Sequence, residues 1–269
     1  MADAAAIAEA AQAAVDAGRQ IPCFTARDAA FDVDAARPVI AALRAIRAAR
    51  GEKPVGRKIG FTNRGIWDEY RVYAPIWGHM YDTTVHAVSP GETIVVSDLP
   101  EPRIEPEIVF GLGRDLRPGM DLGAIAGTID WVAHGFEIVQ SIYPGWAFAA
   151  ADCIADGGLH GKLFVGPRHH LSEGERTTLA KDLSALRVTL SRNGDPVDVG
   201  SGANVLDGPV QALSHLVAVL AGDPFNPPLA AGEMVTTGTM TRAFPVRPGE
   251  RWSTTIEDYP LPGLSVVIG

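Results

Sequence analysis

Hydrophobic positions near the N-terminus recur with the 3.6-residue period of an α-helix. The apolar face of a first predicted helix, which Gly18 ends, consists of Ile7, Ala11, Ala14 and Val15. The apolar face of a second predicted helix, from about residue 34 to Gly51, consists of Val39, Ile40, Leu43 and Ile46. Arginines occupy the other face of the second helix, which we interpret as solvated. We therefore predict a helical N-terminal region over residues 1–55.

After Gly56 the apolar runs become short and are separated by Gly, Pro and Asp, which is typical of strands and turns. The predicted strands are residues 58–61, 93–96, 103–112, 136–141, 161–165, 187–192, 234–237, 251–256 and 264–268. Asn193-Gly194 predicts a tight hairpin between residues 187–192 and 197–199. Two further helices are predicted near residues 121–132 and 207–221. The expected fold is an α+β body over residues 56–269, preceded by the helical region.

Composition and charge narrow the class of protein. Of the 269 residues, 46% are hydrophobic and 20% are charged, a balance typical of a folded globular chain. The formal net charge of −9 gives no electrostatic reason to bind nucleic acid or an anionic membrane. A small anionic substrate would need a local positive charge, which a bound metal ion can supply.

The location of the protein is inferred from its cysteines and its apolar runs. Cys23 and Cys153 have no CxxC spacing and indicate reduced thiols rather than a disulfide framework. The alanine-rich N-terminus lacks the basic start of a signal peptide, and no run of about 18 apolar residues occurs. We expect a soluble cytoplasmic protein.

The most informative segment runs from Arg103 to Phe110. Side chains alternate along a strand, so Arg103, Glu105 and Glu107 are expected to project from one face. If they are buried, two neighbouring carboxylates need protons, a cation or both. Pro106 removes one N–H and favours an edge or irregular position. A solvated polar face on an edge strand is the alternative that the pattern leaves open.

Glu137 is a third acid in a similar setting, inside an otherwise apolar predicted strand. A lone buried acid is costly unless it is paired, so a salt bridge to Arg103 is one interpretation. The other is a metal site with Glu105 and Glu107. Three carboxylates form a hard oxygen shell that suits Mg²⁺ or Mn²⁺ rather than zinc.

Other segments carry candidate catalytic chemistry. Lys58, one of only four lysines, lies between glycines and apolar residues, where it can act as an acid or base or hold a substrate carboxylate. Asp82 can hydrogen-bond a reacting water. His160 and Lys162 lie in a glycine-rich loop that can close over a ligand. Thr239 belongs to a run of hydroxyls and turn amides able to bind an anion.

The usual signatures of other enzyme classes are missing. Gly111-Leu-Gly113 lacks the third glycine of a dinucleotide-binding loop, and the sequence contains no P-loop, HExxH or GxSxG motif.

Taken in order, five segments resemble the 2-keto-4-pentenoate hydratase and 4-oxalocrotonate decarboxylase branch of the fumarylacetoacetate hydrolase superfamily. These segments are Gly56-Arg-Lys58-Ile-Gly60-Phe-Thr62, the strand from Arg103 to Glu107, Phe136-Glu137-Ile-Val, Asp152-Cys-Ile-Ala-Asp156, and Thr237-Gly-Thr-Met-Thr241 with Pro245-Val-Arg-Pro-Gly249. The resemblance runs from about residue 40 to the C-terminus.

The resemblance implies a mixed β-sandwich roll and a homo-oligomer. It also implies a Mg²⁺ or Mn²⁺ site at Glu105, Glu107 and Glu137. Lys58 and Asp82 would then act near the substrate, and we assign Arg57, Lys162 and Thr239 to substrate binding.

The expected reaction is the addition of water to a 2-hydroxy-2,4-dienoate, which gives a 4-hydroxy-2-oxo acid. A 4-oxalocrotonate-type decarboxylase or a C–C bond hydrolase on a related 2-oxo acid is the alternative. A non-catalytic partner subunit of such an enzyme is an alternative of a different class.

One departure from the family pattern concerns His160. Many hydratases of this branch carry a small hydroxyl residue in the glycine-rich loop, where this chain has Leu159-His160-Gly161-Lys162. We expect the imidazole to act as a proton relay, to make room for a second substrate carboxylate, or to accompany a changed reaction.

Overall fold

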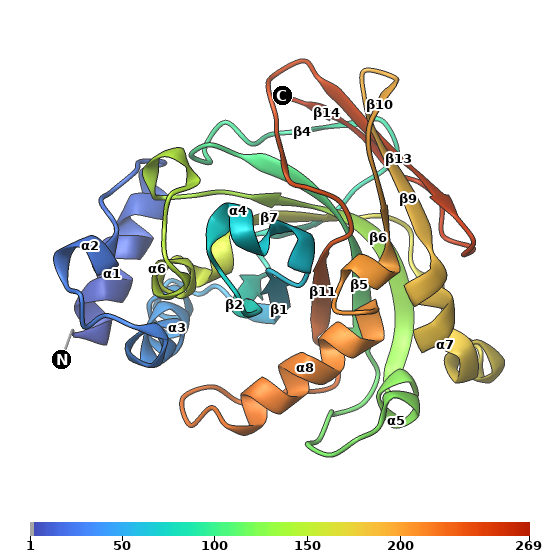
Figure 1. Cartoon of the computed structure of the whole chain (residues 1–269), viewed down its shortest axis with the longest axis horizontal. Helices are drawn as coiled ribbons and strands as arrows, with labels where there is room; N and C mark the ends of the chain where they lie inside the picture. The colour runs from blue at the N-terminus through green and yellow to red at the C-terminus, as the bar shows by residue number, and fades with distance from the viewer. Residues whose placement is uncertain (1–2) are drawn as a thin grey trace.

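Three helices form the N-terminal end of the chain in the computed structural model, which describes residues 3–269. They are α1 (Ala4–Asp16), α2 (Phe24–Arg27) and α3 (Val33–Ala49). Asp3 and Asp32 cap α1 and α3 by accepting hydrogen bonds from backbone amides. The predicted N-terminal helices are thus confirmed, and they lie at one side of the molecule (Figure 1). Their buried faces join the same hydrophobic core as residues far beyond position 55, so the division of the chain at residue 55 stays a prediction.

A nine-stranded mixed sheet forms the centre of the fold. Its strands are β1 (Pro54–Gly60), β2 (Ile76–Tyr81), β3 (Val85–Ala87), β5 (Arg103–Leu112), β6 (Ile129–Val139), β7 (His160–Val165), β8 (His169–His170), β11 (Met234–Thr239) and β12 (Phe244–Pro245). The main order is β2-β1-β11-β5-β6-β7-β3, with β12 paired to β5 and β8 to β6. The two long strands β5 and β6 therefore run through the middle of the sheet (Figure 1).

A second sheet of five strands packs against one face of the first. Its strands are β4 (Glu92–Ile94), β9 (Arg187–Arg192), β10 (Asp195–Ser201), β13 (Arg251–Glu257) and β14 (Ser265–Ile268), in the order β10-β9-β13-β14-β4. Ile104 and Phe136 of the large sheet share a hydrophobic cluster with Trp252 of the small one. Asn193 and Gly194 both adopt positive φ in the predicted hairpin turn. This arrangement confirms the expected α+β sandwich.

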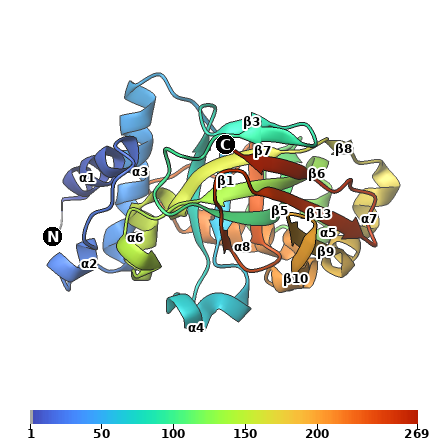
Figure 2. The same ribbon diagram turned by 90° about the horizontal axis from the view of Figure 1, so that it is seen from above.

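The remaining helices are short or lie on the outside (Figures 1 and 2). They are α4 (Trp67–Tyr70), α5 (Leu122–Ala126), α6 (Ala150–Ala155), α7 (Glu173–Ala185) and α8 (Pro209–Ala221), with 3₁₀ turns η1 (Arg64–Ile66), η2 (Pro144–Trp146), η3 (Gly157–Leu159) and η4 (Gly202–Asn204). Among residues 3–269, no helix is long and apolar enough to cross a membrane.

Two sequence-based expectations about elements were wrong. The helix predicted over residues 121–132 ends at Ala126, and β6 already begins at Ile129. The glycine-rich loop predicted over residues 151–162 is instead the helix α6, the turn η3 and the start of β7, where His160 and Lys162 lie. The expectation for Pro106 holds in its second form, because β5 is a central strand and not an edge, but its pairing with β11 next to Pro106 is irregular between Thr236 and Thr239.

Candidate active site

Three glutamates meet on one face of the central sheet. Glu105 on β5 lies directly opposite Glu137 on β6, and Glu107 follows two residues along β5 on the same face. One carboxylate oxygen of each glutamate lies within 4.8 Å of the other two. Glu107 and Glu137 are fully buried. The sequence-predicted cluster is therefore brought together inside the protein.

Burial and mutual repulsion perturb these carboxyl groups. Burial raises the pKa of Glu105 to about 7, against the opposing effect of Lys58 and with further repulsion from Glu137. Burial and both neighbouring carboxylates raise the pKa of Glu107 well above its usual value. Glu107 Oε2 accepts a hydrogen bond of 2.9 Å from the amide of Gly238, but Oε1 is buried without a partner. Such an orphaned oxygen is expected of a ligand whose cation belongs to the site.

Lys58 supplies one positive charge to the cluster. Its Nζ lies 3.3 Å from Glu137 Oε2 and donates a 2.9 Å hydrogen bond to the carbonyl of Gly158. Burial lowers the pKa of Lys58, but the three glutamates outweigh this and raise it, so the side chain is an ammonium group. For Glu137, burial raises the pKa, and Lys58 and His160 together lower it below its usual value. One ammonium group against three carboxylates fits a site for a hard divalent cation.

Two glycines allow the backbone to approach this cluster closely. Gly238 adopts φ +100, and a Cβ there would lie 1.7 Å from Thr62 Oγ1. A Cβ on Gly78 in β2 would lie 1.9 Å from the carbonyl oxygen of Gly157. Gly78 therefore lets β2 pack against the turn whose Gly158 carbonyl holds Lys58.

A pocket opens beside the cluster, with about 440 Å³ of space including the part open to solvent. Its walls are Lys58, Gly60, Phe61, Thr62, Asn63, Ile66, Glu105, Val139, Trp146, Leu159, Thr239 and Ala243. Phe61, Trp146 and Leu159 adopt φ values of 55, 58 and 63, a region that non-glycine residues rarely occupy. Backbone strain of this kind gathers at functional sites because the surrounding structure holds it in place.

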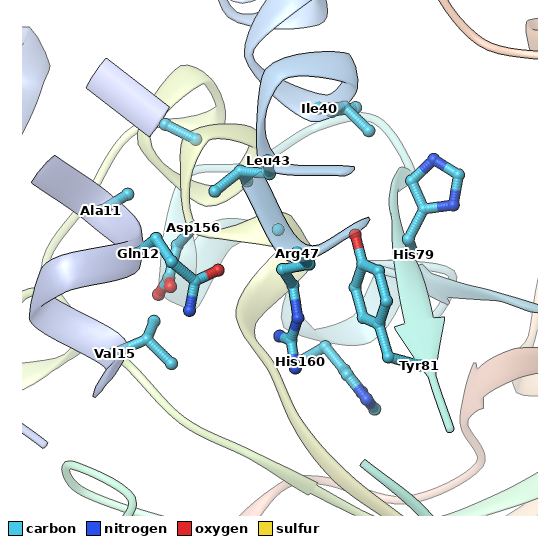
Figure 3. A pocket seen from close by; sticks show the side chains of 12 residues that line it. Ala11, Gln12, Val15, Ile40, Leu43, Arg47, His79, Tyr81, Asp156 and His160 are labelled. Atoms are coloured by element: carbon cyan, nitrogen blue, oxygen red, sulfur yellow. The ribbon is translucent and has the colours of Figure 1, made fainter. Parts of the chain in front are cut away.

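His160 lies behind the cluster rather than in this pocket. Its Nδ1 is 2.8 Å from Glu137 Oε1, and its Nε2 is 2.9 Å from Thr84 Oγ1. His160 also lines a second cavity between α1, α3 and β2, which Figure 3 shows with Arg47 and Tyr81 beside His160. His160 thus contacts a glutamate of the cluster and is not among the residues that line the pocket beside Lys58.

Three predicted site residues do not reach the cluster. Asp82 is exposed just beyond β2, and its carboxylate accepts a hydrogen bond from the amide of Lys53. Arg57 points to the opposite side of β1 from Lys58, where it is buried in an ion pair with Glu233.

Lys162 is the third. Its ammonium group binds Asp98 and the carbonyl of Val95 at the surface. A register shift between Ile138 and Val139 on β6 explains why Lys162 and His160, two residues apart on β7, face different sides of the sheet.

Sequence reasoning missed several residues of the site. Thr84, Trp146 and the carbonyl of Gly158 carried no signal in the sequence because their roles depend on turns that tertiary packing fixes. Phe61 and Thr62 lie in the sequence segment that was singled out because of Lys58, but no role was predicted for either of them.

Similarities to known proteins are consistent with this geometry. No family model matches the chain. The 2-hydroxyhexa-2,4-dienoate hydratase of Comamonas testosteroni is 31% identical over 213 residues, which make up 79% of this chain and 78% of that protein. The structure of 4-oxalocrotonate decarboxylase from Pseudomonas putida G7, complexed with magnesium and adipate, has a TM-score of 0.89 at 28% identity and covers 99% of this chain and 97% of that one. Fumarylpyruvate hydrolase from Pseudomonas aeruginosa, in complex with Mn²⁺ and pyruvate, has a TM-score of 0.56 and covers 79% of this chain and 88% of that one; at 17% identity this likeness shows the fold alone.

Proposed function

Because the chain belongs to the 2-keto-4-pentenoate hydratase and 4-oxalocrotonate decarboxylase branch of the fumarylacetoacetate hydrolase superfamily, we propose that it is a metal-dependent hydro-lyase. Its substrate is a 2-hydroxy-2,4-dienoate, or the 2-oxo tautomer, and its product is a 4-hydroxy-2-oxo acid. The buried cluster of three carboxylates beside one lysine supports this assignment.

Glu105, Glu107 and Glu137 are the residues that would hold Mg²⁺ or Mn²⁺. When bound, such a cation polarises the C2 oxygen of a 2-oxo acid and offsets the negative charge that gathers there during proton transfer. The unpartnered Oε1 of Glu107 supports this role for the cluster.

Lys58 is the proton donor in this scheme. The dienoate loses its C2 hydroxyl proton and gains a proton at C5, which gives a 2-oxo-3-enoate, and water then adds across C3=C4, with its hydroxyl group going to C4 and its other proton to C3. Lys58 lines the pocket and is held as an ammonium group by the glutamates, so it can deliver a proton to the chain of the substrate. Asp82 has no part in this scheme because it lies outside the pocket. Thr239 lines the pocket and can orient the substrate.

The residues that line the pocket favour a hydratase over a decarboxylase. Lys58 and Glu105 are the only charged side chains among its described lining residues, and the others are apolar or neutral. A second carboxylate at the far end of the substrate would find no cationic side chain other than Lys58 among these lining residues. The wall therefore favours a dienoate with one carboxylate and an uncharged tail, which has no terminal carboxylate to lose as CO₂.

One observation favours the decarboxylase as the second candidate. The guanidinium of Arg103 stacks at 4.3 Å over the ring of Trp146, which forms part of the pocket wall. Guanidinium groups pair readily with carboxylates, so this arginine supports a substrate with a second carboxylate. A non-catalytic partner subunit has less support, because the chain has all three glutamates and Lys58.

The test compares two substrates under one condition. Purified protein with Mg²⁺ is mixed with freshly generated 2-hydroxypenta-2,4-dienoate or with 4-oxalocrotonate, and the loss of ultraviolet absorbance is followed with and without EDTA. We expect EDTA-sensitive decay of the dienoate to 4-hydroxy-2-oxopentanoate and little turnover of the dicarboxylate. CO₂ release from 4-oxalocrotonate without hydration of the dienoate would instead establish the decarboxylase.

We also propose that the protein is a cytoplasmic homo-oligomer. Light scattering after size exclusion tests this, and a species of 28.4 kDa would contradict it.

A further inference from the structure

Behind Glu137, two side chains form a hydrogen-bonded chain that leads away from the pocket. Glu137 Oε1 is 2.8 Å from His160 Nδ1, and His160 Nε2 is 2.9 Å from Thr84 Oγ1. Glu137 Oε2 has no hydrogen bond and faces the ammonium group of Lys58 at 3.3 Å. The two carboxylate oxygens therefore have different surroundings, one held from behind and one turned toward the cluster.

The position of Thr84 is fixed by backbone bonds on both sides. Its amide donates to the carbonyl of Tyr81 at 2.9 Å, which closes the turn after β2. Its own carbonyl accepts a 2.8 Å bond from the amide of Leu163 on β7, and Leu163 pairs with Glu137 on β6. The turn, β7 and the glutamate are thus tied into one rigid arrangement.

Accounting for the protons identifies the tautomer of His160. Thr84 Oγ1 accepts a 3.1 Å bond from the amide of Tyr81, and the carbonyl of Tyr81 already has the amide of Thr84 as a donor. The hydroxyl of Thr84 has two acceptors within reach, the carbonyl of Tyr81 at 3.2 Å and His160 Nε2 at 2.9 Å, and Nε2 is the nearer of the two. A neutral ring that accepts at Nε2 carries its proton on Nδ1 and donates it to Glu137.

The opposite tautomer is unfavourable. With the proton on Nε2, the lone pair of Nδ1 would face the Glu137 carboxylate at 2.8 Å. A doubly protonated ring would donate at both nitrogens, and the spectra described below separate it from the neutral ring because its Nε2 carries a proton.

We propose that Thr84 is a positioning residue for the metal centre, because its hydroxyl fixes His160 as the Nδ1–H tautomer and so holds Glu137 with Oε2 turned toward the cation. Hydrogen-bond partners behind a metal ligand orient that ligand and tune its affinity. The inference rests on the proposed metal site but not on the reaction proposed for it. Neither residue lines the pocket beside Lys58, so both act through Glu137.

The first test measures metal affinity in matched threonine variants. Thr84→Val keeps the shape of the side chain and removes the hydroxyl, whereas Thr84→Ser keeps the hydroxyl. Thr83→Val is the control, because Thr83 is the exposed neighbour whose hydroxyl binds Glu52 and not His160. By titration calorimetry we expect Thr84→Val to weaken Mn²⁺ binding about 10- to 100-fold. We expect Thr84→Ser and Thr83→Val to bind nearly as tightly as the parent. Parent-like affinity in Thr84→Val overturns the proposal.

The second test needs neither metal nor turnover. Two-bond ¹⁵N–¹H correlation spectra of the metal-free parent protein distinguish a protonated ring nitrogen from a bare one, and His160→Asn identifies the signal. We expect a protonated Nδ1 and a bare Nε2 for His160, and loss of this pattern in Thr84→Val. A protonated Nε2 in the parent overturns the proposal even if metal binds. If the parent binds no divalent cation, the proposed function fails, whereas the spectra still decide the tautomer.

Discussion

Replacing Glu107 by Gln should separate the stability of the metal-free protein from that of the metal-loaded protein. At 100 times the dissociation constant, a ligand that binds only the folded state stabilises it by about 2.7 kcal/mol. For a chain of this size, each kcal/mol raises Tm by about 2–4 °C, so Mg²⁺ should raise the Tm of the parent by about 5–10 °C. If loss of one carboxylate weakens binding about 100-fold, the same Mg²⁺ concentration stabilises the variant by only about 0.4 kcal/mol, which is a shift of about 1 °C.

Without metal, Glu107→Gln should make the folded protein more stable than the parent rather than less stable. Burial and the neighbouring carboxylates raise the pKa of Glu107 well above its ordinary value of 4.5, so the folded parent binds this proton more tightly than the unfolded chain. Its stability therefore falls as pH rises above 4.5, by up to about 1.4 kcal/mol per pH unit, until the folded pKa is reached. Gln resembles the protonated acid and has no such loss, so the metal-free variant should melt above the metal-free parent at neutral pH.

Scanning fluorimetry with EDTA and with Mg²⁺ measures both effects, and Glu9→Gln at an exposed position of α1 is the control. The reasoning is refuted if Glu107→Gln shows the same Mg²⁺-induced shift as the parent.

Three further predictions follow from the same geometry. Gly78→Ala would place a Cβ 1.9 Å from the carbonyl of Gly157, so we expect the free energy of unfolding, measured by denaturation, to fall by about 1–3 kcal/mol and turnover to fall with it. The control is Gly174→Ala in α7, whose Cβ meets nothing within 4 Å and which should stabilise the protein by about 0.5–1 kcal/mol. Lys58→Met should lower kcat about 10²- to 10⁴-fold with an unchanged circular dichroism spectrum, and activity within tenfold of the parent would argue against its role as proton donor. Mn²⁺ affinity should rise with pH through about 7, because Glu105 must lose its proton before it binds the cation. Calorimetry in buffers of different ionisation enthalpy should detect the released proton, and a pH-independent affinity would contradict the assignment of Glu105 as a metal ligand.

Strand alternation explains what the sequence could predict about this site. Residues 103–112 form β5 as expected, and no bulge interrupts its pairing with β6 near Glu105 and Glu107. The same rule requires Arg57 to point away from Lys58, so the two could not both face the substrate. Lys162 was a different case, because a shift in the pairing of β6 with β7 can be seen only once the strands are placed.

Elements without a clear hydrophobic period were the ones that sequence reasoning missed. All six residues of β2 are buried, so β2 has no alternation of polar and apolar positions, and the place of Asp82 beyond its end could not be foreseen. Helix α7 buries only Leu179 and Leu183, which gives a very narrow apolar face.

The walls and the base of the pocket come from different kinds of structure. The glutamates lie on the two central strands, whereas Phe61, Trp146 and Leu159 lie at turns or strand ends with strained backbone. Turns tolerate changes of side chain far better than central strands do. Directed evolution of substrate range should therefore start at these three positions. Libraries there can change the length and polarity of the substrate tail that the pocket accepts, while the glutamates at its base are left unchanged.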